Sequence, residues 1–233
     1  MAEQKFGGAG EKYQSLLSSF ERWFVTKFVD KIPKCIETYH LTYSTMLWSL
    51  LIVLFGYLAT ININWLWGAA VCVLLQYITD LFDGAVGRKR NTGLIKWGFY
   101  ADHFLDYVFL CSVLISFWFI LPMKYNLILF FLFAILVGYM MDSYLRFAAT
   151  NNFKIAHLGI GPTEARIAFI ITYVLNIVAD RTFLSTLVPY IFIFAAMGLF
   201  YVVYKNQKEI WALDMKIKKE QEENKPASGY DNL

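Results

Sequence analysis

Residues 80–106 read DLFDGAVGRKRNTGLIKWGFYADHFLD, and they set two pairs of aspartates in segments that are otherwise apolar enough to cross a membrane. The pairs are Asp80 with Asp83 and Asp102 with Asp106. An ionised carboxylate in or beside hydrocarbon costs several kcal/mol unless it is paired, hydrated or bound to a cation. Four such groups close together in the chain therefore predict a bound cation and a metal-dependent enzyme.

The sequence on both sides of this stretch predicts an all-α, polytopic membrane protein. Of the 233 residues, 58% are hydrophobic and only 17% are charged, unlike an ordinary soluble protein. A helix needs about 20 mostly apolar residues to cross the hydrocarbon core. Six segments reach or approach that length, and the fifth is the shortest: 41–61, 64–87, 96–121, 125–148, 164–180 and 184–204.

The positions of Lys and Arg predict how these spans are oriented. Nineteen of these residues lie before residue 41, in 88–96, in 146–166 or after residue 204, whereas only Lys124 and Arg181 lie on the opposite side. The excess places both termini and the aspartates in the cytoplasm. The net charge of +3 is therefore a topology signal, and we infer no nucleic-acid partner from it.

Three regions follow from this pattern. Residues 1–40 form a cytoplasmic segment, residues 41–204 the six-helix membrane domain, and residues 205–233 a charged cytoplasmic tail. Within the first region, residues 12–34 repeat apolar side chains at helical spacing, with Lys and Glu on the other face. This pattern predicts an amphipathic helix at the membrane surface, although a helix packed on the protein's own cytoplasmic face fits as well.

The spacing of the aspartates predicts a site for hard metal ions. Asp80 and Asp83 are three residues apart and Asp102 and Asp106 are four apart, so each pair shares one helical face. Antiparallel helices joined by a short loop would bring the pairs together as oxygen ligands for Mg²⁺, Mn²⁺ or Ca²⁺. The basic residues 88–90 follow directly and supply donors for phosphate oxygens, so the segment suits a pyrophosphate substrate.

The order of these residues resembles the signature of the CDP-alcohol phosphotransferases, D-x2-D-G-x2-A-R-x8/9-G-x3-D-x3-D. Gly87 stands where that family usually has alanine. The resemblance implies transfer of a phospho-substituted group from a CDP-linked donor to an alcohol, with release of CMP. It further implies two divalent ions, Mg²⁺ or Mn²⁺, and a homodimer formed through membrane helices.

The resemblance also assigns roles by position. The metal ligands would be Asp80, Asp83, Asp102 and Asp106, and Asp106 is also a candidate for the general base. The expected donor site, where the glycines make room for the nucleotide and the cations face phosphate, comprises Gly84, Gly87, Arg88, Lys89 and Gly98.

Two further features are similar to the eukaryotic choline and ethanolamine phosphotransferases. His103 directly follows Asp102, and residues 161–167 read GPTEARI. This similarity implies that a CDP-linked amino alcohol gives phosphoethanolamine or phosphocholine to a diacylglycerol-like lipid alcohol. His103 and Glu164 then become candidate catalytic bases. The alternatives are a structural hydrogen bond for His103 and a helix-start role for Glu164.

Other readings of the sequence remain open. A related enzyme would use CDP-diacylglycerol and a small polar alcohol such as inositol phosphate, glycerol phosphate or serine. A cation transporter could also carry intramembrane carboxylates, although these lie toward the helix ends rather than at the midplane. Arg146 is expected to pair with Asp142, four residues earlier, or to contact a lipid phosphate.

Overall fold

The computed structural model describes residues 17–154, 156, 161–179 and 182–224, and these contain helices and no strand. The parts of the predicted N-terminal helix before residue 17 and of the tail after residue 224 lie outside the described residues. The helices follow one another in the order α1 (Ser18–Phe28), η2 (Val29–Lys31), α2 (Thr38–Leu58), η3 (Ile63–Trp65), α3 (Leu66–Arg90), α4 (Ile95–Ile120), η4 (Met123–Tyr125), α5 (Asn126–Thr150), α6 (Pro162–Val178) and α7 (Thr182–Glu223).

Within the described residues, five helical stretches are long and apolar enough to cross a membrane, which makes the chain an integral membrane protein. They contain α2, α3, α4, α5 and α7. The fifth predicted span, 164–180, corresponds to α6, which has only 17 residues. Its passage through the membrane therefore stays a prediction. The expected boundary between residues 204 and 205 is not a break in structure, because α7 is one helix of 42 residues.

The helices α3 and α4 both pack against α2. Gly56 allows the close approach of α2 and α4, since a Cβ atom there would lie 2.7 Å from the Cα atom of Ser116. Small residues at such crossings are typical of helices that associate in lipid. The hydroxyl of Ser116 also lies 2.7 Å from that of Tyr173, which ties α6 to the same core.

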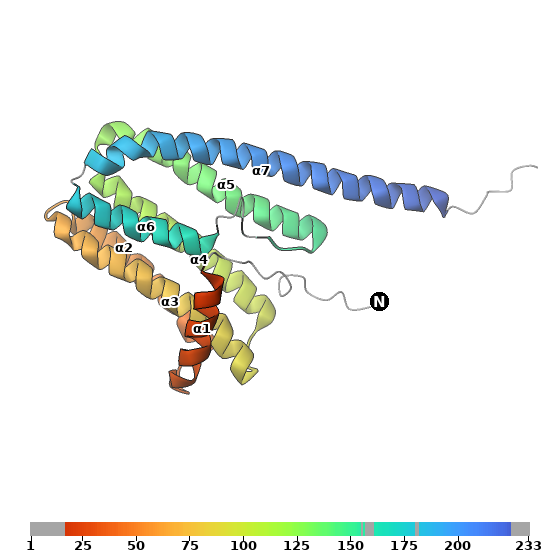
Figure 1. The fold of residues 1–233 in the computed structure, drawn as a ribbon, viewed down its shortest axis with the longest axis horizontal. Helices are drawn as coiled ribbons and strands as arrows, with labels where there is room; N and C mark the ends of the chain where they lie inside the picture. The colour runs from red at the N-terminus through yellow and green to blue at the C-terminus, as the bar shows by residue number, and fades with distance from the viewer. Residues whose placement is uncertain (1–16, 155, 157–160, 180–181, 225–233) are drawn as a thin grey trace, which may run out of the picture.

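The helices α5 and α7 run side by side as a second pair (Figure 1). A Cβ atom at Gly138 would lie 2.8 Å from a methyl of Leu199, so this crossing is close as well. The Tyr139 hydroxyl donates to the backbone carbonyl of Ala195 at 3.1 Å. A close glycine crossing and polar contacts between the helices, this hydrogen bond among them, thus hold the pair together.

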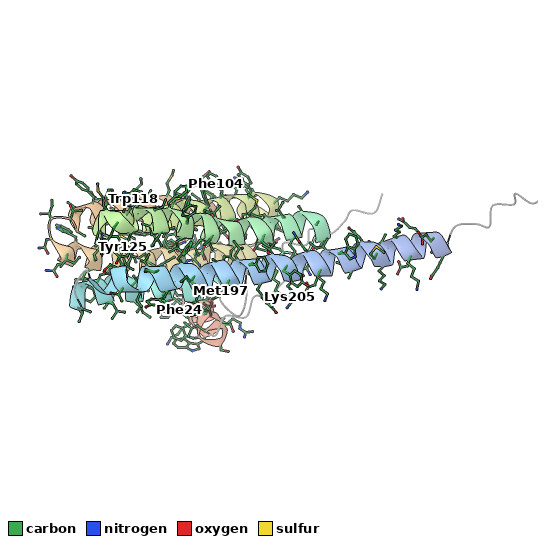
Figure 2. All side chains as sticks on the ribbon, turned by 90° about the horizontal axis from the view of Figure 1, so that it is seen from above. Phe24, Phe104, Trp118, Tyr125, Met197 and Lys205 are labelled. Carbon is green, nitrogen blue, oxygen red and sulfur yellow. The ribbon has the colours of Figure 1, made fainter. Side chains whose placement is uncertain are left out.

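Large apolar side chains also cover the outside of the helix assembly (Figure 2). Phe104, Trp118 and Met197 point outward, with 53%, 46% and 55% of their surface exposed. In water this amount of apolar surface would be an aggregation liability. In a membrane it is the surface that faces the lipid tails.

The helix α1 crosses the end of α3 at a steep angle instead of extending the bundle (Figure 1). The ring of Phe24 packs 5.6 Å from that of Phe82 on α3. Arg90, the last residue of α3, donates to the backbone carbonyls of Ile36 at 2.6 Å and Ile32 at 3.0 Å. The N-terminal segment is therefore packed on the protein. Its outer face keeps Trp23 54% exposed, and the membrane-surface role remains a prediction.

Candidate active site

A short loop turns the chain from α3 into α4 beside the aspartates. The helix α3 ends at Arg90, and Asn91 follows in the left-handed conformation with a φ of 53°. Asn adopts this conformation more readily than most residues, and its N–H closes the helix on the Gly87 carbonyl. The chain reverses direction and α4 begins at Ile95, as the sequence predicts for antiparallel helices.

The four aspartates gather on the facing parts of α3 and α4. The side chains of Asp80, Asp102 and Asp106 retain 23%, 38% and 18% of their exposure, so each is partly accessible. Asp102 lies within electrostatic reach of the other three carboxylates, including Asp83. Four negative charges of this kind repel one another unless a cation lies among them.

One cation within the described residues does lie among them. The Arg166 guanidinium, on α6, places its Nη2 2.8 Å from Asp106 Oδ1 and 3.1 Å from Asp80 Oδ2. Its Nε donates to Gln76 Oε1 at 2.7 Å, and its Cζ lies over the ring of Phe109, 5.8 Å from the centroid. Arg166 is only 4% exposed. Its position on the cytoplasmic side stays a prediction, but its side chain lies inside the helix assembly and bonds to the aspartates.

Asp83 is positioned from a third helix. The hydroxyl of Thr42, on α2, donates to Asp83 Oδ2 at 2.5 Å. The same helix packs against both α3 and α4, and it fixes one of the four carboxylates. The sequence signal that could have revealed Arg166 is an arginine within an apolar helix, which needs a partner in a membrane. No comparable signal marks Thr42.

A comparison with protein families reports the same chemistry. The model of the family described as CDP-alcohol phosphatidyltransferase matches residues 40–212. The chain belongs to this family. The match confirms the family predicted from residues 80–106, whose members are phosphate-group transferases of phospholipid synthesis. No curated protein and no solved structure matches the chain significantly.

The CDP-alcohol phosphatidyltransferases generally depend on divalent metal, and the donor set fits a hard cation. Two of the predicted ligands, Asp80 and Asp106, already share one positively charged group in the form of Arg166. No three His, Cys, Asp or Glu side chains among the described residues converge as a ready metal site. The four carboxylates therefore have the oxygen ligands that a hard metal ion needs. In this structure two of them bond to the Arg166 guanidinium instead.

The family glycines serve two different purposes here. A Cβ atom at Gly98 would have nothing within 4 Å, which is the open space expected beside a ligand. At Gly84 it would approach Arg88 Nη1 at 2.9 Å, the far end of a flexible side chain. At Gly87 it would lie 2.7 Å from Thr38 Cγ2, on the first turn of α2. Gly87 is thus required by helix packing, whatever it contributes to donor binding.

The contact at Gly87 explains the departure from the family's usual alanine. Replacing Gly87 with Ala should overpack the site by about 1–3 kcal/mol. This exceeds the gain of about 1 kcal/mol from better helix propensity. We expect G87A to lower the midpoint of thermal unfolding, measured on the purified protein in detergent. The double variant T38S/G87A, which lacks the clashing methyl, should unfold at or above the wild-type midpoint, with T38S as the control. Equal midpoints for G87A and wild type would contradict this account.

The basic residues after the aspartates also divide into two uses. Arg88 lies over Gly84, beside the site. The ammonium of Lys89 forms an ion pair with Asp30, on η2, and Arg90 holds the backbone of the N-terminal segment. Lys89 has 48% of its side chain exposed, and its contact with donor phosphate stays a prediction.

His103 is enclosed by aromatic rings. The ring centroids of Phe99, Phe153 and Tyr144 lie 4.3, 4.7 and 5.9 Å from that of the imidazole. Its Nδ1 lies 2.6 Å from the Phe99 carbonyl oxygen and 3.8 Å from the Asp102 carboxylate. A carbonyl oxygen only accepts hydrogen bonds, so Nδ1 carries the proton and neutral His103 has its lone pair on Nε2.

Glu164 and Arg146 both have partners within the protein. The carboxylate of Glu164 accepts the Gly161 N–H at 3.0 Å at the start of α6, which agrees with the helix-start alternative. Arg146 donates to Glu209 at 2.8 Å and to Asn206 at 2.6 Å, both on α7. The expected pair with Asp142 is therefore wrong, because α7 competes for both side chains: Asp142 accepts from Asn206 instead. A lipid-phosphate contact for Arg146 stays a prediction.

The N-terminal helix reaches the edge of the site through one carboxylate. Glu21, on α1, accepts hydrogen bonds from the hydroxyls of Tyr77 at 2.6 Å and Thr163 at 2.9 Å. Tyr77 lies one turn before Asp80 on α3, and Thr163 lies one turn before Arg166 on α6. Glu21 therefore joins α3, which carries Asp80, to α6, which carries Arg166.

Proposed function

We propose that the protein transfers phosphoethanolamine or phosphocholine from a CDP-linked donor to a diacylglycerol-like lipid alcohol, with release of CMP. The observation that carries the choice of donor is His103, next to Asp102 and held with its Nε2 lone pair available. The GPTEARI segment supports the same choice, because its arginine, Arg166, bonds to two of the aspartates.

In this reaction the acceptor hydroxyl oxygen attacks the phosphorus that carries the amino alcohol. The bond from that phosphorus to the CMP oxygen breaks, and the hydroxyl proton moves to a base. Bound Mg²⁺ or Mn²⁺, two ions in the proposed site held by Asp80, Asp83, Asp102 and Asp106, would neutralise charge on the transferring group. Arg88 would add a guanidinium fork for phosphate oxygens, beside space at Gly84 and Gly98.

Among the three candidate bases, the contacts favour His103. Asp106 is bound by Arg166, and Glu164 accepts a backbone N–H at the start of α6. His103 uses Nδ1 for the Phe99 carbonyl and so keeps Nε2 to accept a proton. The surrounding rings hold the imidazole in place, which is what a positioned base requires.

Replacing His103 with Gln should reduce turnover of the preferred donor by about 100-fold or more, the usual worth of a general base. Glu164→Gln keeps an acceptor for the Gly161 N–H and should cost less than tenfold. The measurement is CMP release at saturating donor with the purified protein in lipid. Equal losses in H103Q and E164Q would contradict the assignment of His103.

The donor itself is tested by supplying labelled CDP-ethanolamine, CDP-choline and CDP-diacylglycerol separately, each with Mg²⁺ or Mn²⁺. We expect CMP from an amino-alcohol donor together with diacylglycerol. CMP from CDP-diacylglycerol together with inositol phosphate, glycerol phosphate or serine would replace the proposal by that phosphatidyltransferase reaction. Cation flux into liposomes without CMP would indicate the transporter alternative.

We further propose that the active site and both termini face the cytoplasm, with α6 as a sixth span and the chain as a homodimer. The Lys and Arg distribution supports the orientation. Labelling of Cys35, which is exposed, by a membrane-impermeant thiol reagent tests it. In oriented vesicles, Cys35 should react only from the cytoplasmic side.

A further inference from the structure

Arg166 is the one buried cation within the described residues that bonds directly to the aspartates. Its Nη2 bridges Asp80 and Asp106, and 5% of its side chain is exposed. The position between two predicted metal ligands is one that a divalent ion would also favour. A guanidinium and a metal ion at adjoining positions repel each other, and the burial of Arg166 weakens the screening of that repulsion by solvent.

A fully buried amide anchors this arginine. Gln76 is 0% exposed and receives the Arg166 Nε at 2.7 Å. The Gln76 Nε2 has no hydrogen-bond partner within the described part of the chain. A buried donor without a partner is costly, and the hydrogen bond from Arg166 Nε to the Gln76 oxygen offsets part of that cost. The anchor holds the guanidinium at its Nε, and its Nη2 faces Asp80 and Asp106.

We propose that Arg166 is a built-in competitor of the divalent ions, which keeps Asp80 and Asp106 together without metal and weakens metal binding. The inference rests on the proposed metal site and deepens it. The four carboxylates and Arg166 together carry a charge of −3, and two divalent ions bring it to +1. That positive charge suits the pyrophosphate of a CDP-linked donor, so metal and donor favour each other's binding.

The test is a Mn²⁺ titration of the full chain in lipid nanodiscs, stripped of metal beforehand, with free Mn²⁺ measured by electron paramagnetic resonance. We expect Arg166→Gln to lower the Kd for Mn²⁺ at least tenfold, because the competing charge is gone. Arg166→Lys, which keeps the charge, should stay within threefold of wild type. Arg90→Gln removes a positive charge from the end of α3, the helix that carries Asp80. Its Kd for Mn²⁺ should also stay within threefold of wild type.

A Mn²⁺ Kd for R166Q equal to or above that of wild type, in protein that unfolds cooperatively, would overturn the inference. If R166Q gives no folded protein, Gln76→Glu provides the test, since an isosteric carboxylate at the Arg166 Nε neutralises the same charge. It should also lower the Kd at least tenfold, and an unchanged Kd would overturn the inference.

Asp102→Asn separates this inference from the proposed metal site. If D102N binds Mn²⁺ as wild type does, the aspartates are not the metal ligands and both ideas are wrong. If D102N loses Mn²⁺ while R166Q does not gain affinity, only the role of Arg166 is wrong. None of these readouts uses turnover, so the identity of the donor does not affect them.

Discussion

Replacing Asp102 with Asn is expected to reduce CMP release by about 100- to 1,000-fold, and Asp83→Asn should do the same. The amide keeps the size of the carboxylate but removes the charge that would hold a divalent ion, and losing one preorganised electrostatic group costs about this much. Asp102 lies within reach of the other three carboxylates, and Asp83 is fixed by Thr42 at 2.5 Å. The measurement is CMP release by purified variants in lipid, at saturating donor and over a range of Mg²⁺ and Mn²⁺ concentrations.

The control is Asp142→Asn, another carboxylate on a membrane-spanning helix. Asp142 accepts a hydrogen bond from Asn206, on α7, and takes no part in the aspartate cluster. D142N should retain activity within threefold of wild type. Loss of activity in D142N to the same extent as in D102N would mean that any missing carboxylate disrupts the fold. Full activity of D102N would rule out the proposed site.

Replacing Arg166 with Met is expected to destabilise the metal-free protein by about 3–5 kcal/mol, the usual cost of removing one partner from a buried ion pair. Met has nearly the shape of the arginine stem, so the change tests charge and hydrogen bonding rather than volume. Asp80, Asp106 and Gln76 would all lose their bonds to the guanidinium. The measurement is the free energy of unfolding from titration with a denaturing detergent in mixed micelles.

Mn²⁺ should recover part of the stability lost by R166M, because a divalent ion restores a positive charge between the carboxylates. The control is Arg22→Met, since Arg22, within the described residues, bonds to a backbone carbonyl in an exposed part of α1. That variant should unfold within about 0.5 kcal/mol of wild type. A loss below about 1 kcal/mol for R166M would show that the aspartates need no counter-charge.

The helices themselves could be predicted from local patterns. The predicted spans 41–61, 96–121 and 125–148 correspond to α2, α4 and α5 with ends shifted by one to three residues. Apolar runs of this length leave the backbone no partner in lipid except itself, so the helix is decided by the segment alone. The last span continues as helix to Glu223, because Lys, Glu and Gln also favour helix and no turn residue interrupts them before that point.

The contacts that surround the aspartates depend on how separate helices pack. In the sequence, Gly87 is a small-residue variant of the family signature. In the fold it packs against Thr38, a residue almost 50 positions earlier in the chain. Asp142 and Arg146 are correctly spaced for an ion pair along α5, but α7 supplies better partners to both. Such contacts join positions far apart in the chain, and helical periodicity carries no information about them.

The sequence by itself determined the membrane fold, the family and the four aspartates, because length, apolarity and spacing are properties of a continuous segment. The tertiary structure decided how the charge of those aspartates is balanced. It packs α2 against both α3 and α4, and Thr42 of α2 bonds to Asp83. It also brings Arg166 from α6 into contact with Asp80 and Asp106. The physical reason is that a buried charge takes its partner from whichever helix packs beside it, and only packing determines which helix that is.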